Sequence, residues 1–148
     1  MAGFTEAYLP YLLARASHEV SSSFHAALRE WDLSVPEWRV LACLTDADGL
    51  GVGQLAEMAL MKQPSMTKVL DRMEADGLIR RKATAEDRRR VLIHLTPKGR
   101  ARVKPALAAA RIHQRERLAP FDDAERAVIL RALHLLIGED APQQNALK

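Results

Sequence analysis

Residues 77–99 read GLIRRKATAEDRRRVLIHLTPKG, and this stretch decides the fold. Two short strand-like runs, 78–82 and 91–95, flank a turn that carries Asp87, Arg88, Arg89 and Arg90. The pattern predicts a small hairpin with a cationic tip. A helix-like stretch with basic residues, 64–76, comes just before it. A basic helix followed by a basic hairpin suits a winged DNA reader, in which the helix enters the major groove and the tip enters the adjacent minor groove.

The composition is that of an ordinary globular domain, with 148 residues, 48% of them hydrophobic and 28% charged. Residues 1–10 include Glu6 and no leading cations, unlike a secretory signal. No apolar run approaches the roughly 20 residues that cross a bilayer. We therefore expect a cytoplasmic protein with no membrane partner.

Positive charge is concentrated in one part of the chain. The net charge is only +3, yet residues 62–104 hold 13 Lys or Arg and 5 Asp or Glu, a balance of +8. A concentrated positive field attracts the phosphate backbone of nucleic acid. A solvated charged face is the alternative interpretation. The coincidence with the hairpin favours double-stranded DNA as the partner.

Helical periodicity predicts a first helix over 6–31, a short helix over 53–59 and the basic helix that ends before Gly77. A capping box of Ser34 and Glu37 begins the helix between the first two. The strands 78–82 and 91–95 follow. The fold class is thus mainly α-helical with a small β-wing.

Two further helices complete the chain. Thr96 marks the start of a long one, in which Pro105 predicts a kink or a break. Asp122 and Glu125 form a second capping box ahead of the last helix, and residues after Gly138 are expected to fray.

These elements predict a winged helix-turn-helix DNA-binding domain over 34–96, with helical dimerisation regions over 1–33 and 97–148. The terminal helices are apolar enough to need burial, yet lie far from the winged core in sequence. Pairing with a second copy would bury them. An isologous homodimer would also present two recognition helices to the half-sites of a pseudo-palindromic operator, about one DNA turn apart.

Three segments together resemble the MarR (multiple-antibiotic-resistance regulator) family. They are LAE at 55–57, TKVLDRME with GLI within 67–79, and DRRR followed by VLIHLTPKG at 87–99. The resemblance covers 54–99 closely and the flanking helices loosely. It implies a homodimeric winged helix-turn-helix protein, usually a repressor, that releases DNA when a small molecule binds or a thiol is oxidised. It further implies that Arg89 enters the minor groove and that Asp87 orients the wing arginines by charge-assisted hydrogen bonds.

The outward face of the basic helix and the wing supply candidate DNA contacts. Gln63 can bond adenine through two atoms, and the hydroxyl side chains beside it suit base edges or phosphates. Lys68 and Arg72 suit phosphates, which fix register without reading sequence. The candidate DNA-binding residues are Lys62, Gln63, Ser65, Thr67, Lys68, Arg72, Arg88, Arg89 and Arg90.

Alternatives remain for some of these side chains. Arg72 could pair with Asp76 or Asp87 instead of DNA, and a salt bridge that merely fixes the turn is the alternative for Asp87 and Arg88. Residues 80–82, all basic, alternate along a strand, so at least one of them points away from DNA.

A polar stripe on the first helix, opposite its apolar side, predicts one wall of an effector pocket, with a solvated face as the alternative. Arg15 could clamp a carboxylate and His18 could donate a hydrogen bond. Tryptophans nearby could form an aromatic wall, or else belong to core packing. The candidate effector-binding residues are Arg15, His18, Ser22, His25, Trp31, Trp38 and Arg39. The family resemblance suggests a small aromatic carboxylate as the effector.

Other chemistry finds little support in the sequence. Cys43, the single cysteine, is interpreted as a small buried hydrophobe, with a redox-sensing thiol as the alternative. The family's peroxide-sensing branch uses a cysteine near the start of the first helix, where this chain has none. Scattered histidines disfavour a zinc site, and no catalytic or cofactor motif is found, so we expect neither an enzyme nor a cofactor. A winged-helix protein-interaction module without DNA readout is the alternative function.

Overall fold

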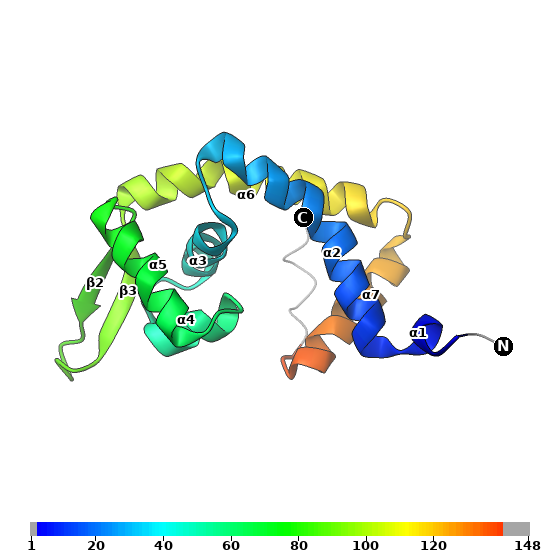
Figure 1. Ribbon diagram of the computed structural model, residues 1–148, viewed down its shortest axis with the longest axis horizontal. Helices are drawn as coiled ribbons and strands as arrows, with labels where there is room; N and C mark the ends of the chain where they lie inside the picture. Colours follow the sequence, from blue (N-terminus) through cyan, green and yellow to red (C-terminus); the bar gives the residue numbers. More distant parts are fainter. Residues whose placement is uncertain (1–2, 141–148) are drawn as a thin grey trace. The chain divides into compact units, whose positions relative to one another are not determined.

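A computed structural model describes residues 3–140 of the chain. The chain divides into two compact units after Arg111. The architecture is mainly helical with one small sheet, as the sequence predicts. The elements, in chain order, are α1 (Phe4–Ala7), α2 (Leu9–Ala27), the 3-10 helix η1 (Leu28–Trp31), α3 (Val35–Asp46), β1 (Leu50–Gly51), α4 (Val52–Met58), α5 (Gln63–Ala75), β2 (Ile79–Ala83), β3 (Val91–Leu95), α6 (Pro97–Leu118) and α7 (Asp123–Ile137) (Figure 1).

The first unit contains the sheet and the helices that cover it. The three strands are antiparallel in the order β1-β3-β2. β2 and β3 form the predicted hairpin, with Arg81 opposite Ile93 in the register. Helices α3 and α5 pack against the sheet, and α4 contacts α5 at the helix-turn-helix corner (Figure 1). The wing therefore projects from the side of the sheet next to the recognition helix.

One apolar core holds this unit together, and it uses residues on both sides of the predicted 34–96 segment. Phe24 and Leu28 enter it from α2 and η1, and Val103 and Ala106 enter from α6. Fully burying a phenylalanine, leucine or valine side chain contributes about 1.5–3 kcal/mol. The first turns of α6 and the end of α2 thus fold as part of the winged core.

Local sequence signals set most helix boundaries. The Ser34 hydroxyl accepts a hydrogen bond from the Glu37 N–H, and the Glu37 carboxylate accepts one from the Ser34 N–H, which completes the predicted capping box. A second box begins α7. The Thr96 hydroxyl caps α6 by accepting from the Gly99 N–H. Gly77 follows α5 with φ +74°, the left-handed conformation that glycine adopts without steric cost.

Three predicted features are wrong. The first helix is not continuous over 6–31: Tyr8 separates α1 from α2, because its extended backbone leads into Pro10 in the first turn of α2, and the last turn tightens into η1. Of the kink or break predicted at Pro105, the break is wrong: α6 is helical from Pro97 to Leu118 with Pro105 inside it, and Val103 and Ala106 are buried on either side. The first wing strand is shifted by one residue, to Ile79–Ala83. Of the tail expected to fray, residues 141–148 lie outside the described part.

The second unit contains the end of α6 and α7, and few of its apolar side chains are buried. α7 has no buried residue. Val128 and Ile137 are each 66% exposed, and Leu135 is 61% exposed. Within residues 3–140, no helix has the combination of length and apolar character that would let it cross a membrane.

Candidate DNA interface

The recognition helix α5 has one apolar side and one polar side, because its apolar residues recur at helical spacing. Met66, Val69, Leu70 and Met73 are buried against the core. Burial of this stripe turns the other side of the helix outward. The exposed positions on α5 and at its N-cap include Lys62, Gln63, Ser65, Thr67, Lys68 and Arg72. All six predicted contact residues of this helix are therefore exposed to solvent.

These exposed side chains differ in what they can still bond. The Thr67 hydroxyl donates its proton to the Gln63 carbonyl one turn earlier, at 3.1 Å. It therefore keeps only its acceptor capacity, which suits a base amino group better than a phosphate oxygen. Lys62, at the N-cap of α5, and Lys68, one turn into the helix, add positive charge to the same exposed side.

The tip of the wing is a turn fixed by its own hydrogen bonds. The Asp87 carboxylate accepts from the backbone N–H of Arg89 at 2.9 Å. The Thr84 hydroxyl bonds both the carbonyl and the N–H of Asp87, and the Thr84 N–H donates to the Arg90 carbonyl. Asp87 thus orients the tip through backbone contacts in the described structure. Arg88, Arg89 and Arg90 are all exposed, so three guanidinium groups project from an ordered turn.

An ionic cluster joins the wing to the recognition helix. Arg81 of β2 donates hydrogen bonds from its guanidinium to Glu74 and, at 2.7 Å, to Asp71, both on α5. Its backbone N–H also donates to Glu74 at 3.0 Å. These hydrogen bonds hold the pKa of Glu74 below its ordinary value. Arg81 is thus the strand cation turned toward α5, while Arg80 and Lys82 are exposed.

The base of the wing is held by Asp48, in the loop between α3 and β1. Its carboxylate accepts from the Leu95 N–H at 2.9 Å and lies 3.4 Å from the His94 ring nitrogen and 3.6 Å from the Arg100 guanidinium. Burial alone would raise the pKa of Asp48, but the hydrogen bonds from Leu95 and His94 outweigh it and lower the pKa. No local sequence pattern distinguishes Asp48 from other loop carboxylates.

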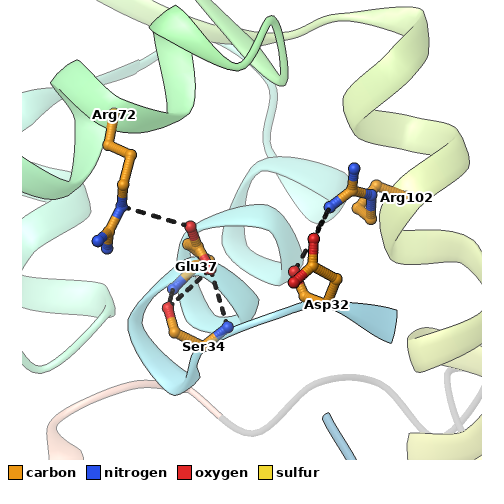
Figure 2. Close-up of polar contacts among 5 residues, drawn as sticks. All are labelled: Asp32, Ser34, Glu37, Arg72 and Arg102. Carbon is orange, nitrogen blue, oxygen red and sulfur yellow. Dashed lines mark hydrogen bonds and ion pairs between the residues drawn. The ribbon is translucent and has the colours of Figure 1, made fainter. Parts of the chain in front are cut away.

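Arg72 is paired, but not with the predicted partners. Figure 2 shows its guanidinium directed at Glu37 on the first turn of α3, with 3.7 Å between Nε and Oε1. The expectation of Asp76 or Asp87 is wrong because Glu37, held by the Ser34 capping box, already stands across from the recognition helix. The Glu37 side chain is only 13% exposed and that of Arg72 is 60% exposed. Arg72 can therefore meet both Glu37 and an external anion.

A cavity of about 610 Å³ lies beside this pair, within the first unit. The residues that line it come from α2, η1, α3, α5 and α6. Arg102 of α6 lies 3.5 Å from the Asp32 carboxylate at the cavity wall (Figure 2). His25 and Arg29 also line the cavity. Three arginines, one histidine and the carboxylates of Asp32, Glu37 and Asp76 thus line a space large enough for a small molecule.

The structure divides the seven candidate effector residues among different places. His25 lines the cavity. Arg15, His18 and Ser22 lie on the exposed part of α2, where Arg15 stacks 5.9 Å from the Tyr11 ring and the Ser22 hydroxyl donates to the His18 carbonyl. The remaining three are half-buried: Trp31, Trp38 and Arg39.

The tryptophans serve the core. Trp31 and Trp38 both pack against the buried cluster, and Trp38 meets the Phe24 ring edge-on with 5.0 Å between centroids. Two cavity cations, Arg29 and Arg102, were absent from the sequence-based set. Position in the sequence gave no signal for them, because the cavity forms only when η1, α3, α5 and α6 fold together.

Cys43 on α3 is half-buried and packs against the core. Burial, with the nearby Asp46 carboxylate, raises the pKa of its thiol. That environment disfavours the reactive thiolate. Among the described residues, no three His, Cys, Asp or Glu side chains come together as a metal site.

Known proteins share this arrangement. The MarR family model matches residues 33–91, which contain the helix-turn-helix and most of the wing. The homoprotocatechuate degradative operon repressor of Escherichia coli is 32% identical over 93 residues, a match that spans 63% of this chain and 63% of that repressor.

Two solved structures match over almost their whole length. The MarR family regulator SPO1453 from Silicibacter pomeroyi DSS-3 is 41% identical with a TM-score of 0.79, covering 92% of this chain and 99% of that one. Bordetella bronchiseptica BpsR, whose DNA binding is regulated by 6-hydroxynicotinic acid, is 26% identical with a TM-score of 0.79, covering 95% and 99%. The winged helix-turn-helix, the exposed basic wing and these matches all agree. The chain belongs to the MarR family of transcriptional regulators.

Proposed function

We propose that the protein is a homodimeric, sequence-specific repressor that acts in the cytoplasm and releases double-stranded DNA when a small aromatic acid binds. The observation that carries the proposal is the ordered wing tip with Arg88, Arg89 and Arg90 all exposed, joined through Arg81 to a recognition helix with further exposed cations. Cations on a turn whose backbone is held by hydrogen bonds suit the minor groove and the adjacent phosphates.

Exposed apolar surfaces support the homodimer. In the first unit, α2 exposes Leu9, Leu13 and Val20, and in the second unit α7 exposes Val128 and Leu135. Contiguous exposed apolar surface on a soluble chain marks an interaction site. A second copy provides the same surfaces by symmetry, and the dimer then carries two recognition helices for the two halves of a pseudo-palindrome.

The 610 Å³ cavity supports a small-molecule effector. Its volume is in the range of about 300–1,000 Å³ that is usual for ligand pockets. Arg29 and Arg102 on its wall suit a carboxylate, for which guanidinium provides paired donors. An aromatic carboxylate is also the class of ligand to which BpsR answers. In this proposal His25 is the member of the candidate set that contacts the effector.

The Glu37–Arg72 pair connects the cavity to DNA binding. Arg72 belongs to the recognition helix and lines the cavity together with Glu37. An anion in the cavity competes with Glu37 for Arg72 and changes how the C-terminal half of α5 is held. Because a ligand shifts an equilibrium only through different contacts in the two states, this pair is the contact that we propose to differ.

DNA binding is tested with wild-type protein and Arg89→Ala on duplexes selected from a random pool. The wild type should select an inverted repeat and bind it with an affinity that falls steeply with salt. Arg89→Ala should weaken binding by about tenfold or more and lower the salt slope by about one, with unchanged thermal stability. Arg111→Ala, which removes an exposed charge from α6, is the matched control. A flat binding curve for the wild type at low salt would instead support the protein-interaction module.

The effector is tested by a thermal-shift screen of small aromatic acids, followed by release of labelled operator DNA. Arg29→Ala should abolish the response to a hit while operator affinity stays unchanged, because Arg29 lines the cavity and not the wing. Arg15→Ala, on the exposed part of α2, is the comparison variant. If Arg15→Ala loses the response and Arg29→Ala keeps it, the effector binds the polar stripe of α2 and not the cavity.

A further inference from the structure

Leu60, in the turn between α4 and α5, has a backbone conformation that its side chain disfavours. Its φ is +57°. The turn is a Schellman cap, because the Leu60 N–H donates to the Glu57 carbonyl and the Met61 N–H donates to the Ala56 carbonyl. Glycine is the usual residue at this position, since a Cβ clashes in the left-handed region. A leucine here therefore needs an explanation other than local geometry.

Packing does not supply that explanation. The Leu60 side chain is 77% exposed, the highest exposed fraction among the large apolar side chains described. Asp32, the other non-glycine residue described with a positive φ, makes the contrast clear. Aspartate tolerates this conformation, and Asp32 pairs with Arg102. Leu60 has neither the tolerance nor a burial that offsets the strain.

The position of Leu60 in the chain places it beside the candidate DNA contacts of α5. It precedes Lys62, the N-cap of the recognition helix, by two residues. Lys62, Gln63 and Ser65, all exposed, follow at once. The apolar side chain thus stands at the end of the helix that presents the polar DNA contacts. Strain in an exposed residue beside a binding surface is a recognised signal of function.

We propose that Leu60 contacts a thymine C5-methyl group in the major groove and so determines part of the operator sequence. The C5-methyl is the one apolar group that a base pair presents in that groove, and it distinguishes thymine from the other bases. A leucine at the entrance of the recognition helix covers such a methyl and removes both apolar groups from water. The inference rests on the proposed DNA-binding function.

The experiment compares wild-type protein with Leu60→Gly on a duplex selected by the wild type. Glycine relieves the strained φ, so thermal stability should stay equal or rise. Operator affinity should nevertheless fall by about fourfold for each methyl contact, the fold-change that corresponds to roughly 0.8 kcal/mol per buried methylene-sized group. Leu60→Met, which restores an apolar side chain, should retain most of the affinity.

Replacing single thymines by uracil then identifies the methyl, since only that group is removed. One or two positions should weaken wild-type binding by about fourfold and leave Leu60→Gly unaffected. Equal affinities of the two proteins, or equal uracil penalties for both, would overturn the inference while leaving DNA binding intact. Failure of the wild type to select any duplex would overturn the proposed function and this inference with it.

Discussion

The winged core and the terminal helices differ in how far their apolar side chains are buried. Leu41, Leu44, Leu70 and Ile93 in the core are fully buried. In the second unit, α7 has no buried residue, and Val128, Leu135 and Ile137 are more than half exposed. The core is thus complete within one chain, whereas α7 has an apolar surface that a single chain leaves uncovered.

This difference separates stability from assembly. Substitutions within the core should change the unfolding of the chain itself, and substitutions on α7 should change association while the core stays folded. The core itself contains two kinds of interaction: apolar packing, which stabilises the fold, and ionic contacts, which position the wing. Substitutions can therefore test apolar packing, wing positioning and association separately.

The largest expected effect is that of Gly99→Ala, at the start of α6. A Cβ at this position would lie 2.1 Å from the Leu78 carbonyl oxygen, which is backbone and cannot move aside. The same carbonyl accepts the Thr96 N–H, so a shift also breaks the hydrogen bond between the residue before β2 and the residue before α6. We expect a loss of about 3 kcal/mol in unfolding free energy, at the upper end of overpacking costs. Urea denaturation measures it.

Gly51→Ala is the control for that substitution, because nothing lies within 4 Å of a Cβ at position 51. Its φ is −69°, which alanine adopts freely. Its unfolding free energy should match the wild type within about 0.5 kcal/mol. A stable Gly99→Ala protein would mean that the strand and the helix are not packed as closely as described.

Charges placed on the apolar surface of α7 should dissociate the proposed homodimer. Val128→Glu combined with Leu135→Glu adds two carboxylates to side chains that are 66% and 61% exposed. We expect monomers in sedimentation equilibrium and an operator affinity about 100-fold lower, because the two half-sites no longer bind as one unit. Far-ultraviolet circular dichroism and the core's thermal transition should persist.

Arg131→Glu reverses the charge of another exposed residue of α7 without placing charge on an apolar position. It should remain dimeric. If the double variant also remains dimeric, α7 does not form the interface, and the exposed apolar surface of α2 becomes the region to test.

A smaller effect is expected from Glu74→Gln, which weakens the cluster that joins the wing to α5. Glu74 accepts hydrogen bonds from the backbone and side chain of Arg81. Because the Glu74 side chain is 40% exposed, solvent screening reduces the contribution to about 1 kcal/mol. The wild type should be more stable than the variant by this amount at pH 7, measured by urea denaturation.

The pH dependence of this difference follows from the lowered pKa of Glu74. A carboxyl group with a lowered folded-state pKa contributes its full stability above its unfolded value, about 4.3 for glutamate, and loses it as the pH falls through the folded value. The difference should therefore be constant from pH 7 to 5 and shrink below about pH 4. Glu57→Gln, which changes an exposed carboxylate on α4, is the control and should match the wild-type unfolding free energy at pH 7 within about 0.5 kcal/mol.

The sequence predicted those parts of the fold that short-range chemistry controls. The Ser34 capping box, Gly77 after α5 and the strands of the wing each depend on a few neighbouring residues. The apolar stripe of α5 was found in the same way, because its spacing alone determines which side is buried. The exposed contact candidates follow from that stripe by exclusion.

What escaped prediction depends on contacts between distant segments. β1 is only two residues long and exists because Leu50 pairs with Ile93 in β3. Arg72 meets Glu37, 35 positions earlier, and Asp48 meets Leu95 and His94. The sequence shows that each of these residues can form hydrogen bonds or ion pairs. Which partner each one meets depends on the folded arrangement of distant segments.

The smallest expected effect concerns Cys43, which tests whether the core contains a redox sensor. Burial raises the pKa of its thiol, so the thiolate fraction at pH 7 is below that of free cysteine. In the native protein, Cys43 should react with a disulfide reagent more slowly than glutathione does. In urea, its rate should rise to that of a free thiol. Peroxide should leave operator affinity unchanged, and Cys43→Ala should bind DNA as the wild type does. The opposite outcome is rapid modification of the native protein with loss of DNA binding, and no such loss in Cys43→Ala. That outcome would place a thiol switch in α3, where the half-buried packing of Cys43 argues against one.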